Sequence, residues 1–333
     1  MALPPIESAP NTQALQTHAF PGQVVVLRDP AGPSALLKHP VVVIGNFDGV
    51  HSGHRVVIQR GEALARKLGR PCAILTFEPH PADYFAGKPV LFRLTPDEAK
   101  VEALTRLAPS GVIVLTFNEE LVHQSPQAFV EDILIRRLGV SGVVVGFDFQ
   151  FGHKRSGTAA YLAEAGREHG FAVEIVDKVT TGGGEAVHST AAREALEAGD
   201  VARAKTILGH EWFVVAPIIH GQKLGRTLGF PTANMELPAT CKLRHGIYAV
   251  RFTVDGVIYG GVASYGRRPT FDNGAALLET FVFDFKGDLY GKMAEVAFVA
   301  WLRGEEKFDS AEALVVQMNK DKDNARAVLG AAT

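Results

Sequence analysis

Two histidines three residues apart, His51 and His54, close a glycine-rich stretch that begins at Gly45. A β-branched run, Val41 to Ile44, precedes this stretch, and a helix-like segment, Val56 to Lys67, follows it. This arrangement suits phosphate, because the N–H groups and the dipole at a helix start attract an anion and imidazole adds donors. A glycine turn with two incidental histidines is the alternative, but the flanking strand and helix favour a nucleotide site. Its candidate binding residues are Gly45, Asn46, Phe47, Asp48 and Gly53, of which Asp48 could also be a turn former.

A second candidate anion site lies at Ser189, Thr190 and Arg193. Ser189 or Thr190 would cap a helix that runs through Leu196, and Arg193, one turn into this helix, could reach an anion at its start. A plain helix cap explains the same residues. In a doubly wound sheet the helix starts gather at the carboxyl ends of the strands, so the two sites together could hold one nucleotide.

Aromatic and polar residues near two other predicted strands could hold a planar ring. Phe147, Phe149 and Phe151 alternate with polar residues, Asp148 among them, and a half-buried strand would explain this pattern equally well. Asn118 follows the strand Gly111–Phe117, where it could contact a ligand or simply belong to the loop. Asn118, Asp148 and Phe149 are therefore candidate contacts of a ring.

A separate cluster in the second half of the chain could bind a triphosphate with its metal ion. Three glycines spaced four apart, Gly221, Gly225 and Gly229, would let backbone N–H groups approach phosphate oxygens closely. Thr232 and Asn234 offer neutral oxygen ligands that suit Mg²⁺. The alternative is a plain surface loop, but a loop of this length in a compact β domain is usually functional.

Glu279 stands in an apolar run, Leu277 to Phe281, where a carboxylate needs a partner or a chemical task. If Glu279 lies on an exposed face of the strand, its presence needs no functional explanation. As a general base it could accept the proton of a substrate hydroxyl that attacks a phosphoryl group.

The first half of the chain alternates predicted strands and helices, which implies a parallel sheet with helices on both faces. Thr95-Pro96-Asp97-Glu98 predicts a helix start, with Thr95 as the cap and Glu98 completing a capping box. The predicted strands are Val41–Ile44, Pro71–Phe77, Gly111–Phe117, Ser141–Phe147 and Phe171–Val179, and the predicted helices include Val56–Lys67 and Ser125–Leu138.

The second half has short strands with glycine turns, which is typical of a small antiparallel barrel or sandwich. Asp255-Gly256 indicates a hairpin, and a helix, Ser310–Leu329, ends the pattern. The boundary between the halves is expected near Ala198–Gly209. The predicted strands are Phe213–Ile219, Gly246–Val254, Val257–Ser264, Leu277–Phe285 and Ala294–Leu302.

The composition is that of an ordinary soluble globular protein, with 333 residues of which 47% are hydrophobic and 21% charged. A formal net charge of −2 gives no reason to expect a nucleic-acid or anionic-membrane surface. The two cysteines, Cys72 and Cys241, fit neither a zinc pattern nor a disulfide framework, which favours a reducing compartment. No apolar run could span a bilayer and no signal peptide is evident, so we expect a cytoplasmic protein, of an oligomeric state that the sequence does not indicate.

With both clusters in view, the chain resembles the bacterial bifunctional riboflavin kinase/FAD synthetase family, over most of its length from Gln23 to Leu329. The stretch from Gly45 to His54 resembles the adenylyltransferase motif of that family, and Gly229 to Asn234 resembles its riboflavin-kinase motif. Other similar segments are Phe77–Pro81, Gly146–Gly157, Ser189-Thr190 with Arg193, Gly266 with Arg268–Phe271, Glu279, Phe283–Phe285, Gly287–Gly291, Leu302-Arg303 and Lys307-Phe308.

The resemblance implies a Rossmann-like nucleotidyltransferase domain over residues 22–204 and a β-barrel riboflavin-kinase domain with a terminal helix over residues 205–330. The barrel would phosphorylate riboflavin with ATP to give FMN, with Mg²⁺ and phosphate at Thr232 and Asn234 and with Glu279 as the base. The first domain would join FMN to AMP, giving FAD and pyrophosphate, through positioning and charge stabilisation. Its catalytic residues would be His51, His54 and Arg193, and the flavin contacts would be Asn118, Asp148, Phe149 and Arg268.

Three positions depart from the family pattern: His188 stands where serine is expected, Ala192 where isoleucine is expected, and Ser264 where asparagine is usual. His188 keeps open the alternative of a riboflavin kinase with weakened or lost adenylyl transfer. A flavin- or nucleotide-binding regulator without turnover is a further alternative, against which the intact Thr232, Asn234 and Glu279 argue.

Overall fold

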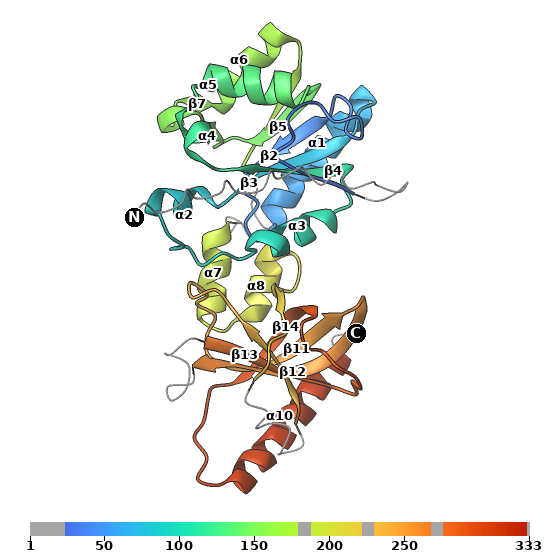
Figure 1. The fold of residues 1–333 in the computed structure, drawn as a ribbon, viewed down its shortest axis with the longest axis vertical. Coiled ribbons are helices and arrows are strands. Elements are labelled where there is room, and N and C mark those ends of the chain that lie inside the picture. Colours follow the sequence, from blue (N-terminus) through green and yellow to red (C-terminus); the bar gives the residue numbers. More distant parts are fainter. Residues whose placement is uncertain (1–23, 179–187, 222–229, 268–275, 332–333) are drawn as a thin grey trace, which may run out of the picture. The chain divides into compact units, whose positions relative to one another are not determined.

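The computed structural model describes residues 24–178, 188–221, 230–267 and 276–331 of the chain (Figure 1). Its contacts divide the chain into two compact units. The first unit comprises Met1–Gly45, Arg60–Glu78 and Ala108–Ile175, and the second comprises Asn46–Gln59, Pro79–Leu107 and Val176–Thr333. The second unit therefore contains segments from both halves of the sequence, including the glycine-rich stretch from Asn46 onward.

A six-stranded sheet in the order β1-β4-β3-β2-β5-β8 forms the centre of the first unit. The pairs β1–β4, β4–β3, β3–β2 and β2–β5 are all parallel, which confirms the predicted parallel sheet. The strands are β1 (Val25–Arg28), β2 (Val41–Ile44), β3 (Cys72–Glu78), β4 (Gly111–Thr116), β5 (Gly142–Gly146) and β8 (Ala172–Val176).

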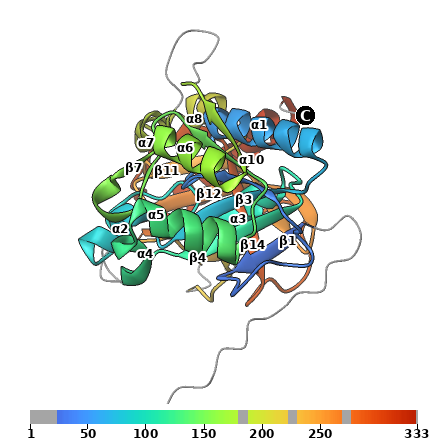
Figure 2. The same ribbon diagram turned by 90° about the horizontal axis from the view of Figure 1, so that it is seen from above.

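Helices cover both faces of this sheet, because its central strands are apolar on both sides. Val43 of β2 faces α1 (Ser52–Leu68), whose Gly61 lies directly against the valine side chain. Val42, on the other face, belongs to one buried cluster with Leu134 of η1 (Phe129–Arg137) and Leu162 of α6 (Ala159–His169). Figure 2 shows α1 and the helix that starts at α5 on opposite sides of β3.

The helix predicted over Ser125–Leu138 has two parts. It begins as the short α5 (Pro126–Ala128), with the Ser125 hydroxyl accepting a hydrogen bond from the Ala128 N–H at 3.1 Å, and continues as the π-helix η1. Its wider winding shows in the bond from the Leu138 N–H to the Ile133 carbonyl, five residues back. The remaining elements of the first half are α2 (Pro81–Ala86), α3 (Asp97–Thr105), α4 (Glu119–His123), β6 (Gln150–Phe151), η2 (His153–Arg155) and β7 (Gly157–Thr158).

An antiparallel six-stranded sheet in the order β10-β13-β12-β11-β14-β9 forms the centre of the second unit. A bridge between Ile219, just after β9, and Asn234 of β10 joins the two edges, so the sheet closes into the predicted barrel. The strands are β9 (Phe213–Pro217), β10 (Thr232–Glu236), β11 (Gly246–Val254), β12 (Val257–Arg267), β13 (Ala276–Val282) and β14 (Met293–Arg303). The hairpin at Asp255-Gly256 is confirmed by positive φ angles of 50° and 77°.

The barrel interior holds the main core of the second unit. Trp212 and Phe298 stack there at 5.0 Å between ring centroids, and the helices α7 (Ser189–Glu197) and α8 (Val201–Leu208) add Leu196 and Leu208 to the same cluster. On the outer face, α10 (Ala311–Ala331) packs Ala325 against the barrel. One buried core therefore joins the barrel with the two helices that precede it.

Candidate active sites

The glycine-rich stretch forms a tight turn with an unusual backbone. Phe47 and Val50 have positive φ angles of 51° and 43°, a conformation that costs energy for residues with large side chains. Gly49 has φ 82°, and a methyl group there would collide with Leu94. Asn46 is exposed, whereas Phe47 is 1% exposed and packs edge-on against the His54 ring at 5.2 Å. Strain of this kind at non-glycine positions is typical of functional turns.

Asp48 anchors this turn to a segment 46 residues further along the chain. Its carboxylate is 2% exposed and accepts hydrogen bonds from the backbone N–H groups of Leu94 and Thr95 at 3.0 Å. The Thr95 hydroxyl in turn accepts from the Gly49 N–H at 2.8 Å. The prediction that Thr95 caps a helix was therefore wrong: Pro96 stands at the cap of α3 without a side-chain bond, because Thr95 holds the turn instead.

Arg193 completes the buried ion pair at Asp48. Its Nη2 lies 2.7 Å from Asp48 Oδ2, and its Nε donates to the Phe92 carbonyl at 2.7 Å. The Ser189 hydroxyl donates to the Asp48 backbone carbonyl at 2.9 Å. The structure thus brings the two predicted anion sites together in one network, in which Arg193 holds the turn through Asp48.

His51 and His54 stack face to face, with ring centroids 3.5 Å apart. His51 Nδ1 accepts the His54 backbone N–H at 3.2 Å, so the ring proton of neutral His51 resides on Nε2. Burial, with a smaller contribution from the charge of His188, lowers the pKa of His51 to about 4, and Asp48 opposes the change. Burial also lowers the pKa of His54, with His51 and Lys100 adding to the effect. Both rings are therefore neutral hydrogen-bond donors near pH 7 rather than cations.

His188 is the cap of α7, and the prediction that Ser189 or Thr190 caps this helix was wrong. His188 Nδ1 accepts the Ala191 N–H at 3.1 Å, the bond that a serine hydroxyl makes at a helix start. Thr190 is exposed in the first turn of the helix. His188 therefore makes the same capping bond that the serine expected at this position would make.

The predicted flavin contacts Asn118, Asp148 and Phe149 lie in the first unit, and so does Gly45. Asn118 caps α4, with its Oδ1 accepting the Leu121 N–H at 3.0 Å, so it has a structural task of its own. Asp148 is exposed in the turn after β5, and Phe149 stacks on Phe151 at 5.5 Å between ring centroids.

The predicted residues of the second cluster meet on the outer face of the barrel. Asn234 of β10 lies opposite Glu279 of β13 in the antiparallel register. With the Asn234 amide oriented to satisfy its neighbours, its nitrogen donates to Glu279 Oε1 at 3.0 Å and its oxygen accepts the Gly221 N–H at 3.3 Å. A methyl group at Gly221 would collide with this amide, so the position requires glycine. Gly225, Gly229 and Arg268 lie outside the described residues.

Ser264 and Thr232 share this face of the barrel. Ser264 of β12 lies opposite Glu279, so the departure from asparagine places a shorter hydroxyl beside the predicted base. Thr232 stands two residues before Asn234 on β10, hence on the same side of the strand. The Thr232 hydroxyl and the second lone pair of the Asn234 oxygen are hard oxygen donors that fit Mg²⁺.

Several residues of the first site were not predicted because nothing in their spacing marks them. Arg93 directs its Nε toward Asp48 Oδ1 at 3.5 Å, and Lys100 is fully buried close enough to His54 to affect its pKa. His210 places its Nε2 3.1 Å from the Gly49 carbonyl. Each lies more than 40 residues from its partner in the sequence, so only folding brings them together.

Comparison with known proteins agrees with the fold. A FAD synthetase model matches residues 34–191, and a riboflavin kinase model matches residues 208–329. Together with the parallel sheet and the barrel, these matches define a two-domain flavin-nucleotide transferase. No helix in the described ranges is long and apolar enough to cross a membrane.

Relatives of known type match nearly the whole chain. A bifunctional riboflavin kinase/FMN adenylyltransferase of Haemophilus influenzae is 40% identical over 88% of this chain and 95% of its own length. One of Escherichia coli K12 is 36% identical over 87% of this chain and 93% of its own length. A crystal structure described as a macrolide-efflux protein from Streptococcus pneumoniae is 29% identical, with a TM-score of 0.75 over 91% of this chain and 99% of that chain. The chain belongs to the family of bifunctional riboflavin kinase/FMN adenylyltransferases.

Proposed function

We propose that this chain carries out two consecutive reactions, ATP-dependent phosphorylation of riboflavin to FMN and adenylylation of FMN to FAD. The observation that carries the proposal is the match of both family models to one chain whose relatives are 36–40% identical over most of its length. We assign adenylyl transfer to residues 22–204 and phosphorylation to residues 205–330.

Adenylyl transfer needs no protein nucleophile, because the FMN phosphate is already an anion. A phosphate oxygen of FMN attacks the α-phosphorus of ATP, and the bond from this phosphorus to the bridging oxygen breaks to release pyrophosphate. The neutral rings of His51 and His54 donate hydrogen bonds to the reacting phosphates. Arg193, held in place by Asp48, adds a fixed positive charge that also acts on His51.

Phosphorylation of riboflavin takes place on the outer face of the barrel. Glu279 accepts the proton of the riboflavin hydroxyl as its oxygen attacks the γ-phosphorus of ATP, and ADP leaves. The Asn234 amide orients the Glu279 carboxylate through the 3.0 Å contact. Mg²⁺, held by Thr232 and Asn234, would neutralise phosphate charge there. Arg268 and the first-unit residues Asn118, Asp148 and Phe149 are the proposed flavin contacts.

The test is to incubate the purified chain with riboflavin, ATP and Mg²⁺ and to follow flavins by chromatography. FMN should appear first and FAD after it. Formation of neither would contradict the proposal. A second assay supplies FMN and ATP and measures pyrophosphate; its absence beside normal FMN formation would favour a kinase without adenylyl transfer. Tight flavin binding with no ATP consumption would favour a regulator.

The proposed location is the cytoplasm. Cys72 and Cys241 are both free, which is typical of a reducing compartment. The proposed ligands are the small molecules riboflavin, FMN and ATP.

A further inference from the structure

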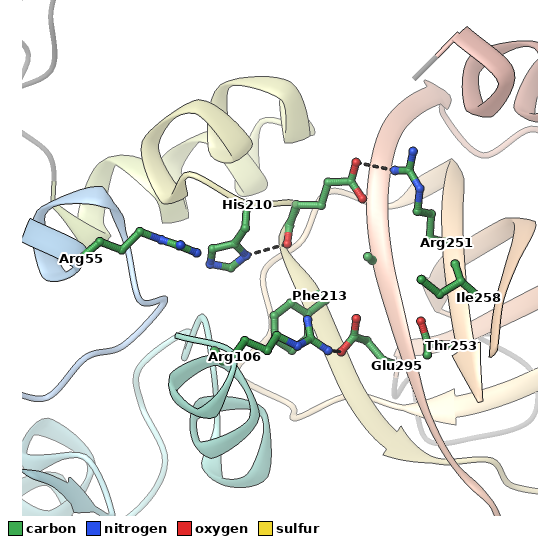
Figure 3. Close-up of a pocket in the computed structure, with 11 residues that line it drawn as sticks. Arg55, Arg106, His210, Phe213, Arg251, Thr253, Ile258 and Glu295 are labelled. Carbon is green, nitrogen blue, oxygen red and sulfur yellow. Dashed lines mark hydrogen bonds and ion pairs between the residues drawn. The ribbon is translucent and has the colours of Figure 1, made fainter. Parts of the chain in front are cut away.

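A cavity of about 250 Å³ lies in the second unit, and Asn234, Glu279 and Asp48 are not among the residues that line it (Figure 3). Its wall contains three guanidinium groups, those of Arg55, Arg106 and Arg251. Two carboxylates, Glu211 and Glu295, line the same space. The ligand that the cavity could bind therefore depends on which of the three arginines form ion pairs with the two glutamates.

Two of the three arginines are already neutralised. Arg106 forms an ion pair with Glu295, and its guanidinium stacks over the Phe213 ring at 4.7 Å from the centroid. Arg251 forms an ion pair with Glu211. The two carboxylates are thus used by arginines that stand next to them, which leaves one positive charge in excess.

Arg55 carries this excess charge. Its Nε is buried, and within the described part of the chain it has no hydrogen-bond partner. Burial lowers the pKa of Arg55, as expected for a cation moved away from water without a counter-charge. A buried donor without an acceptor costs free energy, and an anion placed against it recovers that cost.

His210 connects the cavity to the turn of the first site. Its Nδ1 faces the Glu211 carbonyl at 2.8 Å and its Nε2 faces the Gly49 carbonyl at 3.1 Å. Both ring nitrogens therefore face acceptors, although burial lowers the pKa of His210 and the charges of Arg55 and Arg106 add to this effect. An anion beside the two arginines would offset those charges and favour the doubly donating imidazole.

We propose that this cavity binds a phosphate-type oxyanion, with Arg55 as its principal ligand. Its volume of about 250 Å³ is at the lower limit for ligand pockets, which suits inorganic phosphate or pyrophosphate rather than a whole nucleotide. The free guanidinium fork of Arg55 offers the planar donors that match phosphate oxygens. The site is additional to the two phosphate sites of the proposed reactions.

The experiment follows the Arg55 Nε–H group by nuclear magnetic resonance in the full chain, assigned through its loss in Arg55→Lys. Inorganic phosphate, pyrophosphate and AMP are titrated separately, so that free anions are distinguished from the phosphate of a nucleotide. The Arg55 signal should shift and saturate with phosphate or pyrophosphate. Arg66, exposed in the last turn of the same helix, is the matched control and should not respond.

Calorimetry supplies the second readout, with an ATP analogue present to fill the nucleotide sites. Arg55→Gln should weaken pyrophosphate binding about tenfold or more, the effect of losing roughly 1.4 kcal/mol, whereas Arg66→Gln should leave it unchanged. An Arg55 signal that stays still under saturating phosphate and pyrophosphate would overturn the proposal. So would equal weakening by both variants, or a response to AMP alone. FMN and FAD assays are separate, so failure here leaves the proposed reactions untouched.

Discussion

The two sites differ in what holds their polar groups in place. In the first, Asp48 is 2% exposed and joins the turn, the segment at Leu94 and Arg193, so the bonds that hold the fold also hold the residues proposed for adenylyl transfer. In the second, Asn234, 4% exposed, and Glu279, partly exposed, lie on the sides of their strands opposite to Ala233 and Leu278, which fill the barrel core. Successive side chains of a strand point to opposite faces, so the proposed catalytic residues of the barrel and its core residues lie on different sides of one strand. In the buried turn of the first site, the same residues do both.

The largest expected effect tests this separation at the barrel. Glu279→Gln should lower FMN formation about 100- to 10,000-fold, because the general base is lost. The free energy of unfolding should change little, because the core lies on the opposite face. Initial rates and urea unfolding measure the two quantities, with exposed Glu236→Gln on the neighbouring strand as control. Near-normal FMN formation would show that Glu279 is not the base.

His54→Ala should lower adenylyl transfer from supplied FMN about 100- to 1,000-fold, the effect of removing one donor to a reacting phosphate. Phosphorylation of riboflavin should continue. The exposed His169→Ala, at the end of α6, is the control. An equal loss of both activities would mean that the two sites are not separate.

Asp48→Asn should lower the free energy of unfolding by about 3 to 5 kcal/mol, because Arg193 loses its buried counter-charge. Urea denaturation measures it. The matched change Asp132→Asn breaks an ion pair with Arg136 whose side chains are 40% and 74% exposed, and it should cost less than about 1 kcal/mol. If the two variants lowered the free energy of unfolding by similar amounts, the Asp48–Arg193 ion pair would be no more important for stability than an exposed ion pair.

The neutral histidines predict a dependence of stability on pH. Native His51 takes up a proton near pH 4 and the unfolded residue near 6.5, so between these values the unfolded chain binds more protons. The free energy of unfolding should therefore fall as the pH drops from 6.5 to 4, by about 3 kcal/mol at most for this residue. His51→Asn should flatten the pH profile of the melting temperature, and an unchanged profile would contradict the shift.

The smallest expected effect concerns the departure at His188. His188→Ala should cost about 1 kcal/mol of unfolding free energy through loss of the α7 cap, and His188→Ser should restore most of it. Adenylyl transfer should survive in the serine variant. A serine variant as unstable as the alanine variant would mean that the ring does more than cap the helix.

Local sequence patterns predicted many of the strands and helices of this molecule. Apolar runs such as Val41–Ile44 and the Asp255-Gly256 turn predicted the parallel sheet and the barrel, because both follow from neighbouring residues. The caps at Thr95 and Ser189 were wrong, since Asp48 draws both residues into bonds that no local spacing indicates. β10 was missed because a strand of five residues inside a glycine-rich stretch is recognisable only once Ala233 and Met235 meet the core.

The hydrogen bonds of Leu94 link the part of the chain before residue 205 to the part after it. Its N–H donates to Asp48, and its carbonyl accepts the Trp212 indole N–H at 2.7 Å. A cut between residues 204 and 205 would take the Leu94 acceptor away from the Trp212 indole, which is 1% exposed in the intact chain. The other fragment would expose the apolar side chain of Leu94, which is fully buried in the intact chain. Separation of the two parts would thus expose apolar surface on both.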